Sequence, residues 1–333
     1  AYINSLTATD RLNAKNRELI KTTKEIYEQM KKLQADTGKM QLNVGNYPTL
    51  ESMLGSAVGI SGTAAAAMAA INSLKSGIGT AMDYQQQLSG LAAILGTTTD
   101  KIKELAAQSR ELGSTTIFTA QEVVQLQTEL AKLGYATQDI IAMTPSVLNF
   151  AQATGSSLAD AASLTGAALR MFEKDTSHTT EYVDKMAAAT TKSALSFNYL
   201  NNALSTVAPV ANAFGFELED VLALLGQLAN AGFDASSAAT ATRNILLNLA
   251  DSGGKLAKAL GEPVTNLDEL IKGLKTLNDR GIDLAESLEL TDKRSVAAFN
   301  TFLAGTNTVI DLRDEIVRAN GAAEDMAKTM GDN

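Results

Sequence analysis

The chain has 333 residues, a formal net charge of −9, 45% hydrophobic but 5% aromatic residues, four prolines and no cysteine. The missing cysteines exclude disulfides and thiolate metal sites, and the acidic balance argues against a protein that grips nucleic acid through clustered lysines and arginines. Few prolines with many alanines and leucines favour helices. We therefore expect an all-α fold: a multi-helical array of short amphipathic helices, with a long coiled-coil-like helix at the N-terminus.

Residues 1–45 are predicted to form this long helix. Apolar residues recur every seven positions along one seam, at Leu12, Leu19, Ile26, Leu33 and Met40. The second seam is mostly polar, so a helix that leans on other helices, or a loose oligomeric coil, fits better than a strong dimer.

The next segment, 46–82, is predicted to be helical and rich in Ala and Gly. Its stretch 52–74 runs 23 positions without a charged residue, a length that would span a bilayer. Gly55, Gly59 and Gly62 would let a neighbouring helix approach closely. Two interpretations stay open: a tightly packed helix in water, or a segment that enters a membrane when the protein is released.

Residues 83–250 are predicted to form a domain of short amphipathic helices, because apolar residues recur at spacings of three and four between Gly, Ser and Thr turns. No stretch alternates with period two, so we expect no strands. Thr119 with Glu122 predicts a capping box, and Ser157 with Asp160 predicts a similar pair. Glycines that follow helical runs predict left-handed helix ends at Gly113, Gly134, Gly155 and Gly232.

The stretch GFELEDVLALLGQLANAGF at 215–233 resembles two others, at 119–135 and 155–172. The three are unequally spaced, which predicts a loosely reused helical unit rather than a regular solenoid. Asp220 and its acidic neighbours are expected to complement the positive end of a helix dipole. Gly226, in the middle of the stretch, predicts a place where a neighbour approaches closely.

Residues 251–333 begin with the flexible-looking DSGGK and return to a helical pattern. We expect a C-terminal helical region that leads into further chain, so that the sequence is an N-terminal fragment of a longer protein.

Catalytic and metal-binding patterns are weak. The one histidine, His178, lies in a polar turn, and the chain has no GxSxG motif. One histidine without cysteine leaves a transition-metal site short of ligands. Two Glu–Ser pairs, at 51–52 and 286–287, superficially match a wall-cleaving domain, but its substrate-groove motif is missing. We therefore predict no enzyme, no catalytic residue, no metal and no cofactor.

The stretch 88–250 resembles, in order, the core region of phage tail tape measure proteins of the minor-tail family. The segments that carry the resemblance are RELGSTTIFTAQEVVQLQTELAKLGY, DIIAMTPSVLNFAQATGSSLADAA, YVDKMAAATTKSALSFNYLNNALSTVAPVANAFGFELEDVLALLGQLANAGF and SSAATATRNILLNL. The last departs from the family's AlaGlyThr before Leu-Arg. The residues that fall on the core motif are Gly134, Gly215, Asp220, Gly226, Gly232 and Arg243.

The resemblance implies a structural scaffold inside the tail tube, which sets tail length and later leaves ahead of the DNA to assist its passage across the host envelope. It implies the tail tube protein, tail assembly chaperones and tail-tip or baseplate proteins as partners, homo-oligomers, contact with the host membrane, and no sequence-specific nucleic-acid binding. It places the protein in the virion, and in the host cytoplasm during assembly. The alternative is a membrane-active, toxin-like helical effector that inserts the Ala/Gly helix.

Overall fold

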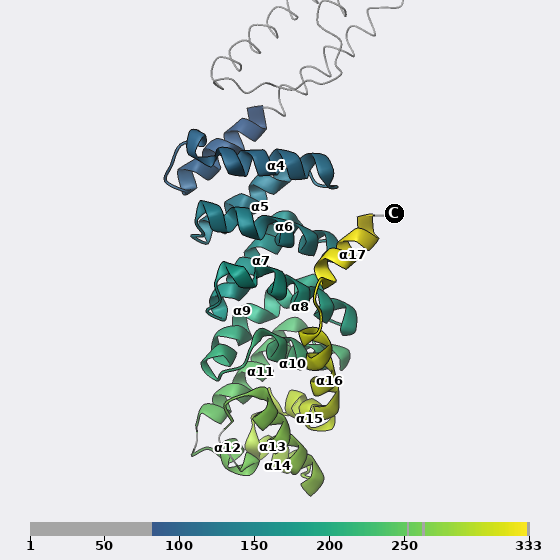
Figure 1. Cartoon of the computed structure of the whole chain (residues 1–333). Coiled ribbons are helices and arrows are strands. Elements are labelled where there is room, and N and C mark those ends of the chain that lie inside the picture. Colours follow the sequence, from purple (N-terminus) through teal and green to yellow (C-terminus); the bar gives the residue numbers. More distant parts are fainter. Residues whose placement is uncertain (1–81, 252, 262–263, 332–333) are drawn as a thin grey trace, which may run out of the picture. The chain divides into compact units, whose positions relative to one another are not determined.

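The computed structural model describes residues 82–251, 253–261 and 264–331 (Figure 1). The predicted coiled-coil-like helix, the uncharged stretch 52–74 and Gly55, Gly59 and Gly62 lie outside the described residues. The chain divides into two compact units, 1–86 and 87–333, and the fold below is that of the second.

The described part of the second unit contains helices and connecting turns without a strand, so the all-α prediction is confirmed. Residues 87–94 are helical. The elements that follow are η2 (Thr99–Ile102), α4 (Lys103–Thr115), α5 (Ala120–Lys132), α6 (Thr137–Thr154), α7 (Leu158–Met171), η3 (Thr176–His178), α8 (Thr179–Lys192), α9 (Phe197–Ala213), α10 (Leu218–Asn230), α11 (Ala235–Ala250), α12 (Lys255–Leu260), α13 (Leu267–Arg280), α14 (Leu284–Leu290), α15 (Val296–Ala304), α16 (Thr306–Val317) and α17 (Ala322–Gly331).

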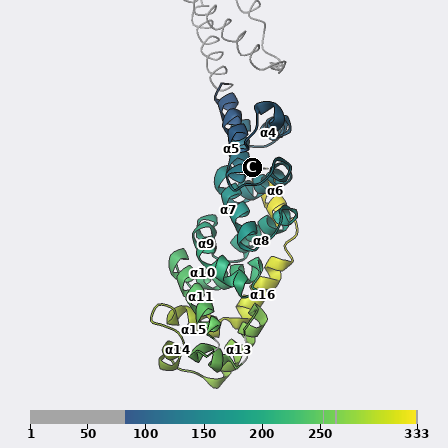
Figure 2. The same cartoon turned by 90° about the vertical axis from the view of Figure 1, so that its left-hand side faces the viewer.

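From α4 to α11 the helices form two layers, because each helix packs on the one two places further along the chain. One layer holds α5, α7, α9 and α11, and the other holds α4, α6, α8 and α10. Most consecutive helices also touch, among them α4 with α5 and α10 with α11, so the two layers pack on each other (Figures 1 and 2). Each helix therefore buries a broad apolar stripe. This stripe is formed by the apolar residues that recur at spacings of three and four in the sequence.

The first layer repeats with a nearly constant period. Its four helices begin after the N-caps Thr119, Ser157, Ser196 and Asp234, at intervals of 38 (119 to 157), 39 (157 to 196) and 38 (196 to 234) residues. Every one of these caps accepts a hydrogen bond from the backbone N–H two or three residues on. A stack of helix pairs with such a period is a short α-solenoid.

This regularity corrects the expectation of a loosely reused unit. The three similar stretches contain α5, α7 and α10, and α10 belongs to the other layer. The three stretches share an amphipathic pattern and an acidic residue in the first helical turn, features that many helices have. The structural repeat is instead seen in the constant spacing of the N-caps. A comparison of whole helix sequences does not detect this spacing.

Turns after the helices use glycine at positive φ, among them Gly134, Gly155, Gly215 and Gly232. Gly113 differs from its prediction, because it lies inside α4 rather than at its end. A β-carbon there would collide with the backbone of Ala120, so this glycine permits the tight turn from α4 into α5.

After α11 the chain forms a smaller group, α12 to α15, and then reverses. α16 packs on α10 and α8, and α17 packs on α8 and α6. Figures 1 and 2 show the yellow C-terminal helices running back along one layer, so that the end of α17 lies beside α6. Residues more than a hundred positions apart are thereby joined.

Candidate functional site

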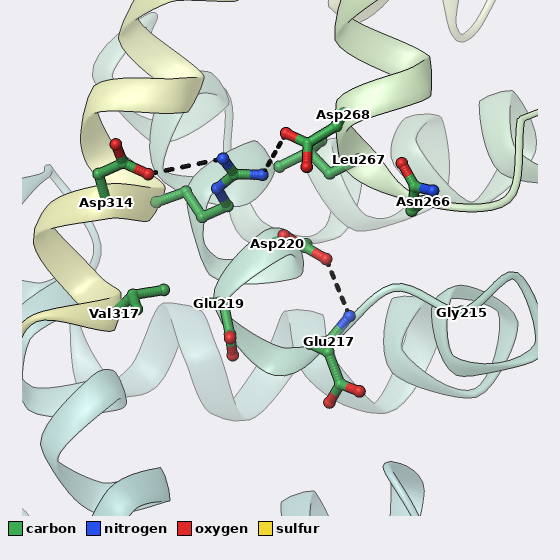
Figure 3. A pocket seen from close by; sticks show the side chains of 10 residues that line it. Gly215, Glu217, Glu219, Asp220, Asn266, Leu267, Asp268, Asp314 and Val317 are labelled. Carbon is green, nitrogen blue, oxygen red and sulfur yellow. Dashed lines mark hydrogen bonds and ion pairs between the residues drawn. The ribbon is translucent and has the colours of Figure 1, made fainter.

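An acidic cleft of about 410 Å³ lies where the starts of α10 and α13 meet the second half of α16 (Figure 3). Five carboxylates and one arginine line it, together with small and apolar residues. The lining residues are Gly215, Glu217, Glu219, Asp220, Asn266, Leu267, Asp268, Arg313, Asp314 and Val317. Two helix N-termini contribute here because acidic residues follow both N-caps and complement the positive ends of the helix dipoles.

Arg313 of α16 ties the cleft together. One guanidinium nitrogen lies 2.6 Å from Oδ1 of Asp268 in α13, and the other lies 3.5 Å from Oδ1 of Asp314 (Figure 3). Burial lowers the pKa of Arg313, but the hydrogen bond and the charge of Asp268 outweigh it and the pKa is raised. The guanidinium therefore stays charged and links two helices that are far apart in the sequence.

Asp220 is the most buried carboxylate of the cleft, with 8% of the residue exposed. Its Oδ2 accepts a hydrogen bond from the backbone N–H of Glu217 at 3.0 Å, which caps α10 (Figure 3). Burial raises the pKa of Asp220 to about 6, although that hydrogen bond opposes the shift. Asp220 is therefore poised to change charge near pH 6.

Two lysines of neighbouring elements neutralise part of the remaining charge. Lys185 of α8 donates to Glu219 at 2.8 Å and to Glu181 at 2.5 Å, and its side chain is 10% exposed. Lys174 lies 3.0 Å from Glu217. Glu219 thus helps hold α10 to α8, and Asp268 with Arg313 helps hold α13 to α16.

In the described ranges, no group of three or more histidine, aspartate or glutamate side chains could hold a metal ion. No helix of those ranges is both long and apolar enough to cross a membrane. The arrangement of carboxylates, lysines and arginine is one that locks helices together.

The predicted capping residues lie at helix starts. Oγ1 of Thr119 accepts from the N–H of Glu122 at 3.2 Å, and Oε2 of Glu122 accepts from the N–H of Thr119 at 2.7 Å. Oγ of Ser157 accepts from the N–H of Asp160 at 3.1 Å. Each pair satisfies backbone donors that an isolated helix start leaves unpaired.

The core-motif residues are spread along the stack. Gly215 and Asp220 line the cleft, whereas Gly134 and Gly232 end α5 and α10. The other two lie within helices: Gly226 in α10 and Arg243 in α11.

Gly226 lies at a close helix contact, and Arg243 is half-buried. A β-carbon on Gly226 would lie 2.5 Å from Cδ2 of Leu312, so the missing side chain lets α16 approach α10. The buried Nε of Arg243 has no hydrogen-bond partner among the described residues.

The weak catalytic candidates have local roles. Nδ1 of His178 lies 2.9 Å from Oε2 of Glu181, one helical turn on. Glu286 pairs with Arg280 at 2.7 Å, and the buried Ser287 contacts the amide of Asn300 at 2.9 Å. The other Glu–Ser pair, at 51–52, lies outside the described residues.

Sequence reasoning missed Asp184, Lys185 and Arg313. Asp184 is 4% exposed and accepts from two backbone N–H groups of the α17 start, 137 and 139 residues away. Lys185 and Arg313 bind partners on other helices. No local pattern marks such residues; the one available signal is a charged side chain on an otherwise apolar helix face.

Comparison with known proteins places the stack in a family. The sequence profile of the phage-related minor tail proteins matches residues 106–302, more than half of the chain. The tape measure protein of Pneumococcus phage Dp-1 is 28% identical over 231 residues, which cover 65% of this chain and 20% of that protein. The probable tape measure protein of Escherichia phage P2 is 29% identical over 163 residues, which cover 49% of this chain and 19% of that protein.

The chain therefore spans about a fifth of the length of these curated relatives. No solved structure matches it. The profile match begins within α4 and ends within α15, so it includes both layers of the stack and much of the smaller group that follows. On this evidence the chain belongs to the phage-related minor tail protein family.

Proposed function

We propose that this chain is a folded structural module of a phage tail tape measure protein. The observation that carries the proposal is the match of the helical stack to a minor tail protein family and to two relatives that are named as tape measure proteins. In this proposal the full-length protein lies in the lumen of the tail tube, sets tail length during assembly, and leaves the tube to assist passage of the DNA.

The stack is poorly suited to set tail length by its own extension. An extended helix measures distance because each residue adds 1.5 Å along its axis. Here the helices α4 to α11 stack side by side in two layers, and α16 and α17 return along the layer of α6, α8 and α10. Each repeat of the stack therefore adds only about 10 Å, the spacing of packed helices, whereas the same number of residues in one extended helix would add about 57 Å. The measuring part would be extended helix elsewhere in the full-length protein.

The acidic character of the chain fits a lumen through which DNA passes. With a net charge of −9, it lacks the excess of cations that binds phosphate without regard to sequence. The tail tube protein, the tail assembly chaperones and the tail-tip proteins are the expected partners, and more than one copy is expected in each tail. These partners follow from the proposed place in the virion.

Deletion in the full-length gene tests this function. Removal of the codons for residues 88–331 should abolish or sharply reduce tail assembly, and the tails that still form should keep their length by electron microscopy. Were this part an extended helical ruler, the tails would instead shorten by about 370 Å, at 1.5 Å per residue. Tails of normal number, length and infectivity would exclude a structural role.

A matched control is an in-frame deletion of equal length in the part of the full-length gene with the strongest coiled-coil pattern. There we expect tails in normal number that are shorter in proportion to the deletion. If both deletions shorten tails equally, the distinction between a folded module and a measuring region is wrong.

A further inference from the structure

The C-terminal helix α17 is attached to the stack differently from the helix that precedes it. Among the described residues of α17, those that are buried are Ala323 and Ala327. In α16 the buried residues include Val309, Leu312 and Ile316. An alanine removes far less apolar surface from water than a leucine or isoleucine does, so α17 gains much less from burial than α16.

Polar contacts at two positions also hold α17 against α6 and α8. Oδ2 of Asp184 accepts from the N–H of Gly321 at 2.7 Å, and its Oδ1 accepts from the N–H of Ala323 at 2.9 Å. Nε2 of Gln152 donates to the carbonyl oxygen of Ala327 at 2.7 Å. Asp184 thus acts as an N-cap supplied by another helix, where the usual cap is the residue just before the helix.

This attachment can be undone at low cost to the rest of the fold. Backbone N–H groups and a carboxylate that separate can each bind water, and α17 itself exposes little large apolar surface, so the apolar cost of undocking lies mainly in the faces of α6 and α8 that it covered. The connection from Val317 to Ala322 includes Gly321 at a φ of +76°, where a β-carbon would meet nothing within 4 Å. It can therefore change direction without a collision at that position.

We propose that α17 is a releasable latch: it undocks from α6 and α8 about the connection 318–321, while α16 stays packed on α10. The two states differ in where the chain leaves the stack. Docked, Gly331 lies beside α6, because a β-carbon on it would lie 2.8 Å from Nε2 of Gln152, and the end of α17 is seen beside α6 in Figure 1. Undocked, the chain departs from the end of α16, and the surfaces of α6 and α8 that α17 covered become accessible.

Distance measurements between spin labels test the latch, and the chain suits them because it has no cysteine of its own. The latch pair is Ala142→Cys with Lys328→Cys, at exposed positions of α6 and α17. The reference pair is Ala142→Cys with Thr308→Cys, the latter at an exposed position of α16. Both pairs should give one distance in the otherwise unchanged 333-residue chain.

In an Asp184→Ala background, the latch pair should gain a second, longer distance, with the undocked population raised roughly tenfold, as expected for loss of a helix cap. The reference pair should not change. An unchanged latch distribution would overturn the proposal, and so would equal lengthening of both pairs, since the helices would then loosen together.

Asp234→Ala is the matched control, because Asp234 also accepts from two backbone N–H groups, at 3.0 Å each, but within its own helix start. It should leave the latch distance as it is. Hydrogen exchange on the unaltered chain gives an independent test: amides of α17 should exchange about tenfold or more faster than those of α16. Equal protection of the two helices would refute the latch even if the Asp184 variant failed to fold.

Discussion

Nζ of Lys185 in α8 lies 2.8 Å from Oε2 of Glu219 in α10, and their side chains are 10% and 17% exposed. The bond joins neighbouring helices of one layer, and its two residues are 34 positions apart in the sequence. Burial lowers the pKa of Lys185, but the hydrogen bonds to Glu181 and Glu219 outweigh it, so the pKa is raised and the ammonium stays charged.

Lys185→Ala should lower the free energy of unfolding by about 2 kcal/mol, because it leaves Glu219 without its partner in a mostly buried position. Urea denaturation followed by circular dichroism measures this loss. The control is Lys132→Ala, which breaks an exposed pair with Glu129 and should cost less than about 0.5 kcal/mol. An equal loss of unfolding free energy in the two variants would show that the buried ion pair of Lys185 stabilises the fold no more than an exposed one does.

Asp220 should make stability depend on pH between about 4 and 6. Its pKa is about 6 in the folded chain and near 3.8 when unperturbed, so the folded state holds the proton more tightly. The contribution to stability is therefore complete below about pH 4 and is lost as the pH rises to 6. Asp220→Asn should match the unaltered chain at pH 4 and exceed its stability by about 2 kcal/mol at pH 7.

Denaturant titrations of both proteins at several pH values test this, since the difference between them removes the titration of all other groups. A difference that is constant from pH 4 to 7 would show that Asp220 titrates normally.

Gly226→Val should destabilise the fold by about 2 kcal/mol, because the new side chain would overlap Leu312 and push α16 away from α10. The control is Gly90→Val, a helical position where a β-carbon would meet nothing within 4 Å. That change should be neutral or slightly stabilising, since glycine is a poor helix former. Thermal melts of the two variants compare them directly, and equal melting temperatures would exclude close packing at Gly226.

Substitutions at two helix N-caps should change the stability of the fold in opposite directions. Ser157→Ala removes the acceptor for the N–H of Asp160 and should cost about 1 kcal/mol. Ala136, the N-cap of α6, has an extended backbone conformation but no side chain that can accept a hydrogen bond. Ala136→Ser should therefore stabilise by about 0.5 kcal/mol. Denaturation midpoints measure both, and a loss of stability in Ala136→Ser would show that a hydroxyl cannot reach the helix start.

Local patterns determined much of this protein. The three- and four-residue spacing of apolar side chains predicted helices and no strands, as seen in the described residues, and pairs such as Thr119 with Glu122 marked where helices begin. The ordered segments of the core were sufficient to indicate the family. All of these depend on residues within one or two helical turns of one another, where the chain itself sets the geometry.

The tertiary structure alone decided which helices share a layer, and that α16 and α17 return along it. Asp184 illustrates the reason: nothing within its own helix indicates that its carboxylate caps a helix that begins at Ala322. Such a contact depends on the packing of every helix between the two partners. Side-chain spacing specifies which face of a helix is buried, but the neighbour that covers this face is chosen by the shape and charge of the whole stack.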